Sequence, residues 1–543
     1  MNAPTTDKMS TLDDPESASV KPEWRHVLNL ADLENKRSVV VKFAGKQISI
    51  FKTQNGVQAC DNRCPHEGYP LAEGSLGEDC ILTCNWHNWK FNLETGENLY
   101  GGDKLRIYPA RVTKNEIWLD LADPPFSERY KRVLSNLHDA FNDNEYDRIA
   151  REIARLEKIG ANPKDALRQA IRWSYEKMEF GFTHAYAGMA DWLAIRKDFK
   201  NNSEIELVCL LEPVSHSAFD VLREPDYPYS TDVSNYDSTC LLDAIEQEDE
   251  VRAIALIRGG LRAGMDFEDF EEVLSRAALT HYNDFGHSLI YVVKTGELIK
   301  ELGKEVEEPL LLALIRSLVF ATREDKIPEF RKYPTVLSRW GKSGNSKPHY
   351  SIWHKKGINS ALNATLSCSK SSPLCIYNEL LTACAINMLS YDIAQQYKTH
   401  VTVSGNINWL DFSHGITFAN AVRQQCSKFP NLWPEGLLQM SCFVGRNAAY
   451  IDDDYDLAKW GTENMQPGLS RLIDKVIDHG HDEHIVSVHG LKTLQAVREE
   501  LKLLDKEKSI LLFAALNRFI NSPIKRRQTR RTAYQSIKFV NKE

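Results

Sequence analysis

The 543-residue sequence contains no run of about 18 apolar residues, so we expect no membrane-spanning helix. Its first residues lack a basic start and an apolar stretch, which predicts no secretory signal, and their composition predicts a disordered lead-in over residues 1–21. Acidic residues outnumber basic ones, for a net charge of −8, so nucleic acid is not an expected partner. The cysteines are an odd 11 and thinly spread, which argues against a disulfide framework and predicts a reducing, cytoplasmic location.

Residues 22–121 have the pattern of a small antiparallel β domain. Residues 38–43, 47–51 and 117–121 are β-branched or aromatic runs, separated by turn signals at Asn55-Gly56, Thr95-Gly96 and Gly101-Gly102. Residues 122–130 contain Asp-Pro-Pro and are expected to form a linker.

Beyond the linker the pattern becomes helical. Apolar residues recur at spacings of three and four over residues 146–159, 165–178, 249–262, 308–322, 375–396 and 490–504. The expected fold class is therefore multidomain, with the β domain followed by a large, mostly α-helical domain over residues 131–523. Residues 524–543 are expected to form a basic, solvated tail.

Two Cys-His pairs lie in turn regions of the β domain. They are Cys64-Pro-His66 and Cys84-Asn-Trp-His87, with 17 residues between His66 and Cys84. Two thiolates and two imidazoles are the ligand set of a Rieske [2Fe–2S] cluster, in which the thiolates hold one iron and the imidazoles the other. Neutral imidazoles in place of thiolates raise the reduction potential of such a cluster above that of an all-cysteine ferredoxin.

A structural zinc site is the alternative for this region. Cys60-x3-Cys64 and Cys80-x3-Cys84 supply four cysteines, and the two Cys-His pairs also match a Cys2His2 zinc site.

Residues 22–120 resemble the Rieske domains of ring-hydroxylating oxygenases and their ferredoxins, in Cys-Pro-His-x-Gly, in Trp-His-x-Trp-x-Phe and in the following Thr-Gly-Glu. The resemblance implies a [2Fe–2S] cluster on Cys64, His66, Cys84 and His87. Two positions depart from the family pattern, because Asn85 stands where proline is usual and Asn88 where glycine is usual. Tyr69 and Trp86 fall where respiratory Rieske proteins carry an additional cysteine pair, so the sequence resembles the soluble, lower-potential kind.

The catalytic half of the ring-hydroxylating oxygenases is not recognisable in this sequence. Their mononuclear iron signature is close to Asp-x-x-His-x4-His, and here Asp284-x-x-His287 has Val292 at the second histidine position. No Gly-x-Gly-x-x-Gly follows a strand, so the nicotinamide or flavin is expected on an external reductase or ferredoxin that serves as electron donor.

The helical region has its own histidine clusters. On a helix, Asp284 would lie about one turn from both His281 and His287, and helix-borne histidines and carboxylates at such spacing build iron sites in bundles. His479, His481, His484 and His489 form the densest cluster, while His184, His354 and His414, each isolated, are interpreted as core residues when taken singly.

Three short pieces of the helical region also resemble the questin-oxidase-like family, which are mostly helical enzymes of oxygen insertion into aromatic polyketides. The pieces are Gly286-His287-Ser-Leu-Ile-Tyr, Phe412-Ser-His414-Gly-Ile-Thr-Phe and Asp482-Glu-His484-Ile-Val-Ser-Val-His489-Gly-Leu-Lys. This resemblance implies functional roles for His287, His414, His484 and His489, which are the expected catalytic residues and ligands of a second, non-haem iron.

Two hypotheses follow. In the first, the chain is an oxygenase whose [2Fe–2S] cluster passes electrons to the non-haem iron, which activates O2 toward a small apolar or aromatic substrate. In the second, the chain is an electron carrier fused to a helical partner-binding domain without a second metal. The sequence leaves open the substrate, the oligomeric state and whether electrons pass within one chain or between chains.

Overall fold

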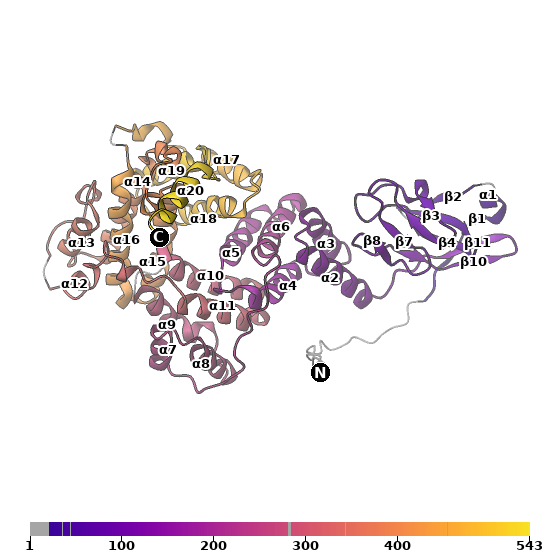
Figure 1. Ribbon diagram of the computed structural model, residues 1–543, viewed down its shortest axis with the longest axis horizontal. Coiled ribbons are helices and arrows are strands. Elements are labelled where there is room, and N and C mark those ends of the chain that lie inside the picture. Colours follow the sequence, from indigo (N-terminus) through magenta and orange to yellow (C-terminus); the bar gives the residue numbers. More distant parts are fainter. Residues whose placement is uncertain (1–20, 35, 44, 281–283, 343, 453) are drawn as a thin grey trace. The chain divides into compact units, whose positions relative to one another are not determined.

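The computed structural model describes residues 21–543 except 35, 44, 281–283, 343 and 453. The chain forms two compact units, residues 1–163 and residues 164–543. Figure 1 gives the element labels used below.

Short antiparallel strands form the core of the first unit. They make three sheets, ordered β1-β11-β10, β2-β3-β4-β9 and β5-β6-β7-β8. The strands are β1 (Trp24–Asn29), β2 (Ser38–Phe43), β3 (Lys46–Thr53), β4 (Gly56–Asp61), β5 (Ser75–Leu76), β6 (Ile81–Thr83), β7 (Lys90–Asn92), β8 (Asn98–Tyr100), β9 (Ile107–Tyr108), β10 (Ala110–Thr113) and β11 (Glu116–Asp120), with a short helix α1 (Leu30–Glu34) after β1. This confirms the β domain predicted for the N-terminal region.

Two of these sheets place the Cys-His pairs. The β3–β4 hairpin turns at Gly56, whose φ of 105° suits glycine, and β4 then leads into the first ligand loop, residues 62–70. The second ligand loop, residues 84–89, joins β6 to β7. A buried core that includes Phe51, Leu82 and Phe91 supports both loops.

The first unit continues into helices α2 (Phe126–Asn142) and α3 (Tyr146–Lys158). The expected linker at residues 122–130 therefore contains the start of α2, which follows Pro124-Pro125 directly. The expected start of the helical domain at residue 131 also differs from the division at 163/164. The reason is that α3 carries arginines that pair with Asp103 of the β domain, and α2 packs against α3.

The described residues of the second unit form helices joined by loops, and their only β pairing is an isolated bridge between Tyr391 and Ile451. Its helices are α4 (Asp165–Ser174), α5 (His184–Arg196), α6 (Ser203–Asp220), α7 (Ser238–Glu246), α8 (Glu250–Arg262), α9 (Phe267–Thr280), α10 (His287–Leu302), α11 (Glu307–Val319), α12 (Tyr333–Leu337), α13 (Ile358–Ser367), α14 (Pro373–Leu389), α15 (Trp409–Lys428), α16 (Trp433–Asn447), α17 (Met465–Ile477), α18 (His484–Glu500), α19 (Lys506–Asn521) and α20 (Thr529–Val540). The predicted large helical region is thus confirmed.

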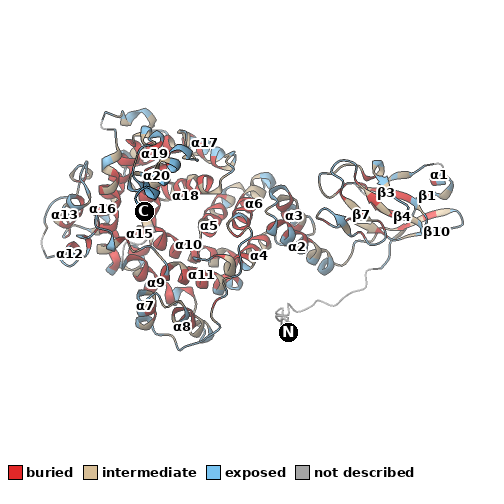
Figure 2. Ribbon diagram, viewed as in Figure 1, coloured by how far each residue is buried: buried red, intermediate tan, exposed pale blue. Residues whose placement is uncertain are grey.

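Four of these helices form the centre of the second unit. α5 packs against α10 and α18, and α15 packs against the same two helices, which closes a ring of four. In Figure 1 they lie around a common centre, and in Figure 2 their residues are largely buried. A bundle of this kind directs side chains from facing helices toward one axis, where metal and cofactor sites are built.

The basic segment at residues 524–543 is more ordered than a solvated tail. Helix α20 occupies Thr529–Val540, and Arg531 is buried. Its guanidinium donates to the carbonyl oxygens of Gln395 (2.8 Å) and Lys398 (2.9 Å), which anchors the helix on the segment after α14.

Among the described residues, no helix combines the length and apolarity needed to cross a membrane.

Candidate functional site

The two ligand loops share one backbone pattern. In the first, Cys64 N–H donates to Tyr69 O (2.9 Å) and Gly68 N–H donates to Cys64 O (2.8 Å). In the second, Cys84 N–H donates to Trp89 O (2.8 Å) and Asn88 N–H donates to Cys84 O (2.9 Å). Each cysteine therefore stands at the start of a closed loop whose fifth residue has a positive φ, 76° at Gly68 and 61° at Asn88.

This pattern explains one departure from the family. Asn88 takes the left-handed conformation that glycine usually provides, and asparagine is among the few residues that adopt it readily. Asn85 also has a role, because its side chain accepts from Ser75 Oγ (2.9 Å) and donates to Glu73 O (2.8 Å). The second loop is thereby tied to β5.

Substitutions at Asn88 test this requirement. We expect Asn88→Gly to load the cluster as the wild type does, since glycine adopts a positive φ without strain. Asn88→Val is expected to lose most of its cluster, because a β-branched residue at this φ costs upward of about 1–2 kcal/mol in the loop that carries Cys84 and His87. Acid-labile sulfide and visible absorption measure the loading. Equal loading in both variants would contradict the role of the backbone conformation.

The four ligands fit a two-iron cluster. The His66 and His87 rings lie 4.5 Å apart between centroids, and His66 Nδ1 is buried without a hydrogen-bond partner. Cys64 and Cys84 are both buried. Burial raises the pKa of the Cys64 thiol to about 12, opposed by the backbone N–H groups of His66 and Glu67, which donate to its sulfur. The thiolate form, which binds metal ions, is therefore unfavourable at this buried sulfur unless a bound metal ion stabilises it.

The same geometry argues against zinc. A single tetrahedral zinc needs all four ligand atoms around one point. One ligand atom each of His66, His87 and Glu67 lie within 4.8 Å of one another. Among the described residues, no cysteine sulfur lies within 4.8 Å of two such ligand atoms that are equally close to each other. Separate histidine and cysteine pairs match two irons, one for each pair.

The helical bundle brings four histidines together. They come one from each helix of the ring, His184 from α5, His287 from α10, His414 from α15 and His489 from α18. His287 Nε2 lies 3.0 Å from His184 Nε2 and 2.8 Å from His414 Nε2, and His414 Nε2 lies 3.2 Å from His489 Nε2. Nitrogens of two imidazoles bound at right angles, with metal–nitrogen bonds of about 2.0–2.1 Å, are about 2.9 Å apart. The four nitrogens therefore have the spacing of one coordination sphere.

The protonation of two of these rings is fixed by their other nitrogen. His414 Nδ1 lies 2.7 Å from Leu410 O, and His489 Nδ1 lies 2.6 Å from Ile485 O. A carbonyl oxygen only accepts, so each Nδ1 carries the proton and each Nε2 presents a lone pair. Burial lowers the pKa of both rings well below the usual histidine value, aided by His287 at His414 and by Lys492 at His489, which keeps them neutral. Two lone pairs that face each other at 3.2 Å repel, and a bound cation would relieve that repulsion.

The local sequence sets these positions. His184 and His287 begin their helices, where Thr183 caps α5 by accepting from Ala185 N–H (3.2 Å) and Gly286, at φ 78°, starts α10. The segment 284–286 is the 3-10 turn η4 with Phe285 at φ 51°, so the expected continuous helix from His281 to His287 does not form there. His281 itself lies outside the described residues.

His484 does not join the other three predicted ligands. It lies five residues before His489 on α18, which turns it about 140° around the helix. Its ring stacks instead on His216 (4.9 Å between centroids, 13° between planes), and its Nε2 is 3.4 Å from Ser215 Oγ. The fourth member of the cluster is His184, which had been interpreted from sequence as a core residue. In retrospect, His184 and His287 share one sequence feature. Each begins a helix shortly after a glycine, Gly181 in the first case and Gly286 in the second.

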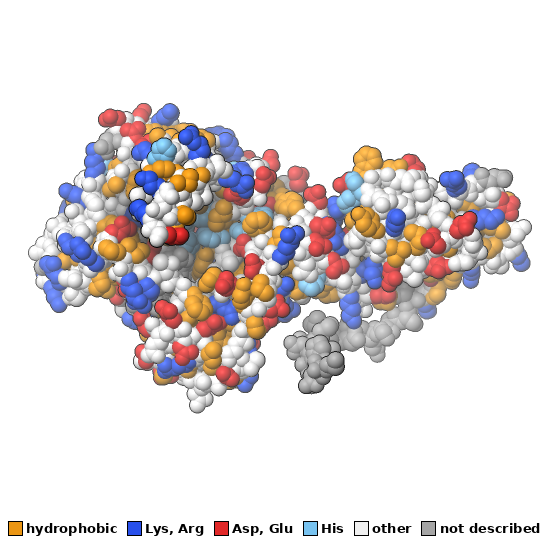
Figure 3. Space-filling model, in the orientation of Figure 1, with side chains coloured by type: hydrophobic (Ala, Val, Ile, Leu, Met, Phe, Trp, Pro, Cys, Tyr) orange, Lys and Arg blue, Asp and Glu red, His pale blue; other side chains and the backbone are white. Residues whose placement is uncertain are grey.

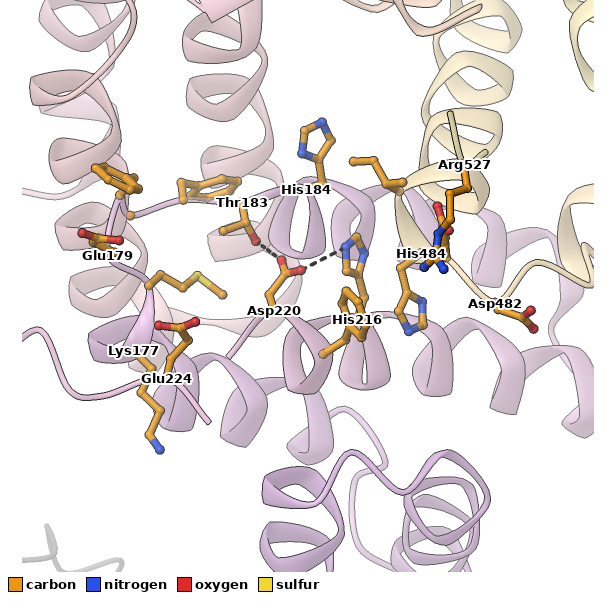
Figure 4. A pocket seen from close by; sticks show the side chains of 17 residues that line it. Lys177, Glu179, Thr183, His184, His216, Asp220, Glu224, Asp482, His484 and Arg527 are labelled. Carbon is orange, nitrogen blue, oxygen red and sulfur yellow. Dashed lines mark hydrogen bonds and ion pairs between the residues drawn. The ribbon is translucent and has the colours of Figure 1, made fainter. Parts of the chain in front are cut away.

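A pocket of about 710 Å³ opens beside the histidine cluster (Figure 4). His184, which is half-buried, belongs both to the cluster and to the pocket wall. Figure 3 shows histidine side chains inside a hollow on this face of the helical unit. The apolar part of the wall consists of Met178, Phe180, Phe182, Phe219 and Ile485.

The polar part of this wall is hydrogen-bonded. Asp220 accepts from Thr183 Oγ1 (2.7 Å) and lies 3.5 Å from His216 Nε2, as the dashed lines of Figure 4 show. Burial raises the pKa of Asp220 to about 6 and lowers that of His216 to about 3. A neutral imidazole therefore lies beside a carboxyl group that exchanges protons near neutral pH.

Comparison with known proteins identifies the first unit. The sequence profile of the Rieske [2Fe-2S] domain matches residues 23–104. A Rieske domain-containing protein of Homo sapiens is 30% identical over 115 residues, which cover 18% of this chain and 73% of that protein. The ferredoxin component of an alkene monooxygenase system from Xanthobacter autotrophicus is 30% identical over 91 residues, which cover 17% and 75%.

Among solved structures, the ferredoxin of carbazole 1,9a-dioxygenase from Nocardioides aromaticivorans matches with 22% identity and a TM-score of 0.17, over 18% of this chain and 96% of that one. The [2Fe–2S] cluster implied by the sequence resemblance is thus the cofactor of the first unit, and electron transfer is its chemistry. Through residues 23–104, the chain belongs to the Rieske [2Fe–2S] domain family.

Proposed function

We propose that this protein is an oxidoreductase in which the Rieske cluster supplies electrons to an iron ion held by His184, His287, His414 and His489. The observation that carries the proposal is the convergence of four Nε2 atoms, one from each helix of the ring, at metal-ligand spacing. Imidazole ligands suit iron, copper, nickel and zinc alike. A redox-active metal is favoured over zinc, because an electron-carrying domain on the same chain needs an electron acceptor, and we propose that this metal is iron.

An iron with nitrogen ligands and open positions supplies oxygen activation. We therefore propose an oxygenase whose substrate binds in the pocket at His184. The size of that pocket suits a small molecule, and its phenylalanines suit an apolar or aromatic one. Carboxylates outnumber cations on the wall, which disfavours an anionic substrate; the charged residues are Lys177, Glu179, Asp220, Glu224, Asp482, Glu483 and Arg527.

The chain's own residues account for the remaining needs of such a reaction. Asp220 can hold or release a proton at the pocket wall, beside the neutral ring of His216. His87, which is exposed, and Trp86, 62% exposed, offer an external reductase or ferredoxin a route to the cluster.

Iron and acid-labile sulfide per chain, measured on fully loaded protein purified without oxygen, test the proposal. We expect three irons and two sulfides, because the cluster accounts for two irons and two sulfides and the histidine site for one more iron. The variant His287→Ala is expected to keep the two sulfides and lose one iron. Two irons in the wild type would instead favour an electron carrier fused to a partner-binding helical domain. Zinc in place of the third iron would contradict the redox role of the site.

A further inference from the structure

Helix α3 lies against the first ligand loop of the Rieske cluster. The guanidinium of Arg155 donates from Nη2 to the carbonyl oxygen of Pro65 (3.2 Å) and from Nη1 to Asp103 Oδ2 (2.8 Å). It also pairs with Glu152, one turn earlier on the same helix. These residues all belong to the first compact unit. An arginine from outside the β domain is thus bonded to the loop that holds two of the four ligands.

Pro65 stands between Cys64 and His66, and its carbonyl belongs to the same peptide group as the N–H of His66. That N–H donates to the sulfur of Cys64. The peptide therefore accepts from Arg155 at its oxygen and donates to the cluster ligand at its nitrogen. Hydrogen bonds in such a series strengthen one another, so a positive charge at the oxygen makes the N–H a stronger donor to the sulfur.

The position of Arg155 is fixed by a buried ionic network. Asp103 and Glu152 are fully buried, and Asp103 also accepts from Arg148, which lies two turns before Arg155. A Cβ added at Gly102 would lie 2.4 Å from the guanidinium carbon of Arg148, so the glycine allows α3 to seat on this loop. Charged groups that are buried and mutually bonded are held in place, because separating them leaves an uncompensated charge.

The loop of residues 101–103 also supports a histidine ligand of the cluster. A Cβ at Gly101 would lie 2.4 Å from the Trp89 ring, and Trp89 stacks on His66 at 4.5 Å between centroids and 14° between planes. Residues 101–103 therefore bridge from the aromatic ring under His66 to the arginines of α3. Helix α3 contacts the surroundings of the cluster on both the cysteine and the histidine side.

We propose that Arg155 is a positioning residue for the [2Fe–2S] cluster, which holds the first ligand loop through Pro65 and raises the reduction potential of the cluster. Reduction adds one electron to the cluster, and no bond forms or breaks. A fixed positive charge and stronger hydrogen bonds to sulfur both favour the more negative, reduced state. Arginine remains protonated in this setting, so its charge is permanent.

A redox titration without oxygen on the full-length holoprotein tests the proposal. The reduced cluster is followed by its electron paramagnetic resonance signal while mediator dyes supply the single electron. We expect Arg155→Gln to lower the reduction equilibrium constant about tenfold, which is about 59 mV for a one-electron couple. Arg155→Lys, which keeps the charge but not the paired donors, is expected to fall between Arg155→Gln and wild type. A shift in the g values of the signal is expected in both variants.

Arg148→Gln is the matched control. It removes an arginine from the same helix and the same Asp103 pair, but Arg148 makes no bond to Pro65 among the contacts of the described residues. We expect its potential to stay near the wild-type value. Equal shifts in Arg148→Gln and Arg155→Gln, or no shift in a fully loaded Arg155→Gln protein, would overturn the proposal.

Loss of the cluster in Arg155→Gln leaves the test decidable. In that case the reduction potential of Arg155→Lys is measured instead. A potential below that of the wild type supports the proposal, and a potential equal to that of the wild type overturns it. The titration reads only the Rieske cluster, so its outcome does not depend on whether the four histidines bind iron.

Discussion

Replacing His414 by alanine is expected to remove the metal of the helical bundle and to slow the oxygen-dependent reoxidation of the reduced Rieske cluster by about 100-fold or more. His414 Nε2 lies within 3.2 Å of both His287 Nε2 and His489 Nε2, so its loss opens the middle of the ligand set. Even residues that only orient metal ligands contribute about 10- to 100-fold to affinity, and a ligand contributes at least as much. Rapid mixing of reduced protein with O2, followed by the visible absorption of the cluster, measures the rate.

His484→Ala is the control for this variant. It removes a histidine from the same helix, α18, that carries His489, but the His484 side chain faces His216 and the pocket. We expect His484→Ala to keep the third iron and His414→Ala to lose it, with two sulfides in both. Loss of the third iron in both variants would restore the ligand set expected from sequence. Fast reoxidation in a His414→Ala protein that lacks the third iron would refute the electron path through the bundle.

The candidate cluster ligands could be proposed from sequence because their arrangement is local. Cys64 and His66 lie in one closed loop, and Cys84 and His87 lie in another, so the sequence spacing within each pair is also its spatial arrangement. The same reasoning identified strands β2, β3 and β11 and helices α3, α4, α8, α11, α14 and α18, because their periodicity depends on neighbours in sequence. Periodicity in the sequence did not show which of the two structural units a helix belongs to. α3 was predicted within a residue of its end, yet its arginines seat it on the β domain.

The bundle site could be predicted only in part because it is long-range. Its neighbouring histidines are separated by 103, 127 and 75 residues, and no local pattern says that four helices will bring them together. His484 was favoured because histidines are dense around it, although five residues of helix turn it away from His489. His184 was interpreted as a core residue because the sequence around it does not indicate the three distant histidines that lie next to it in the fold.

Replacing Gly286 by alanine is expected to destabilise the helical unit by about 2–5 kcal/mol and to lower its metal content. The φ of 78° costs alanine about 1–2 kcal/mol. An added Cβ would lie 2.3 Å from Cδ2 of the fully buried Phe418, and overpacking of this kind costs about 1–3 kcal/mol. His287 follows directly, so any backbone shift that relieves the contact moves a ligand. Denaturant unfolding and iron content measure the two effects.

Gly303→Ala separates the contact with Phe418 from backbone strain, because Gly303 ends the same helix with a φ of 96° and has no atom within 4 Å of an added Cβ. We expect it to lose about 1–3 kcal/mol, because its ψ of 174° lies in a backbone region essentially restricted to glycine, and to keep its metal. In a Phe418→Leu background, Gly286→Ala should cost less than in the wild type, since the smaller side chain can yield. If the two glycine variants are equally stable and bind equal iron, the start of α10 does not fix His287 through this contact. If only Gly286→Ala loses iron, a glycine that binds nothing itself determines where the metal ligand stands.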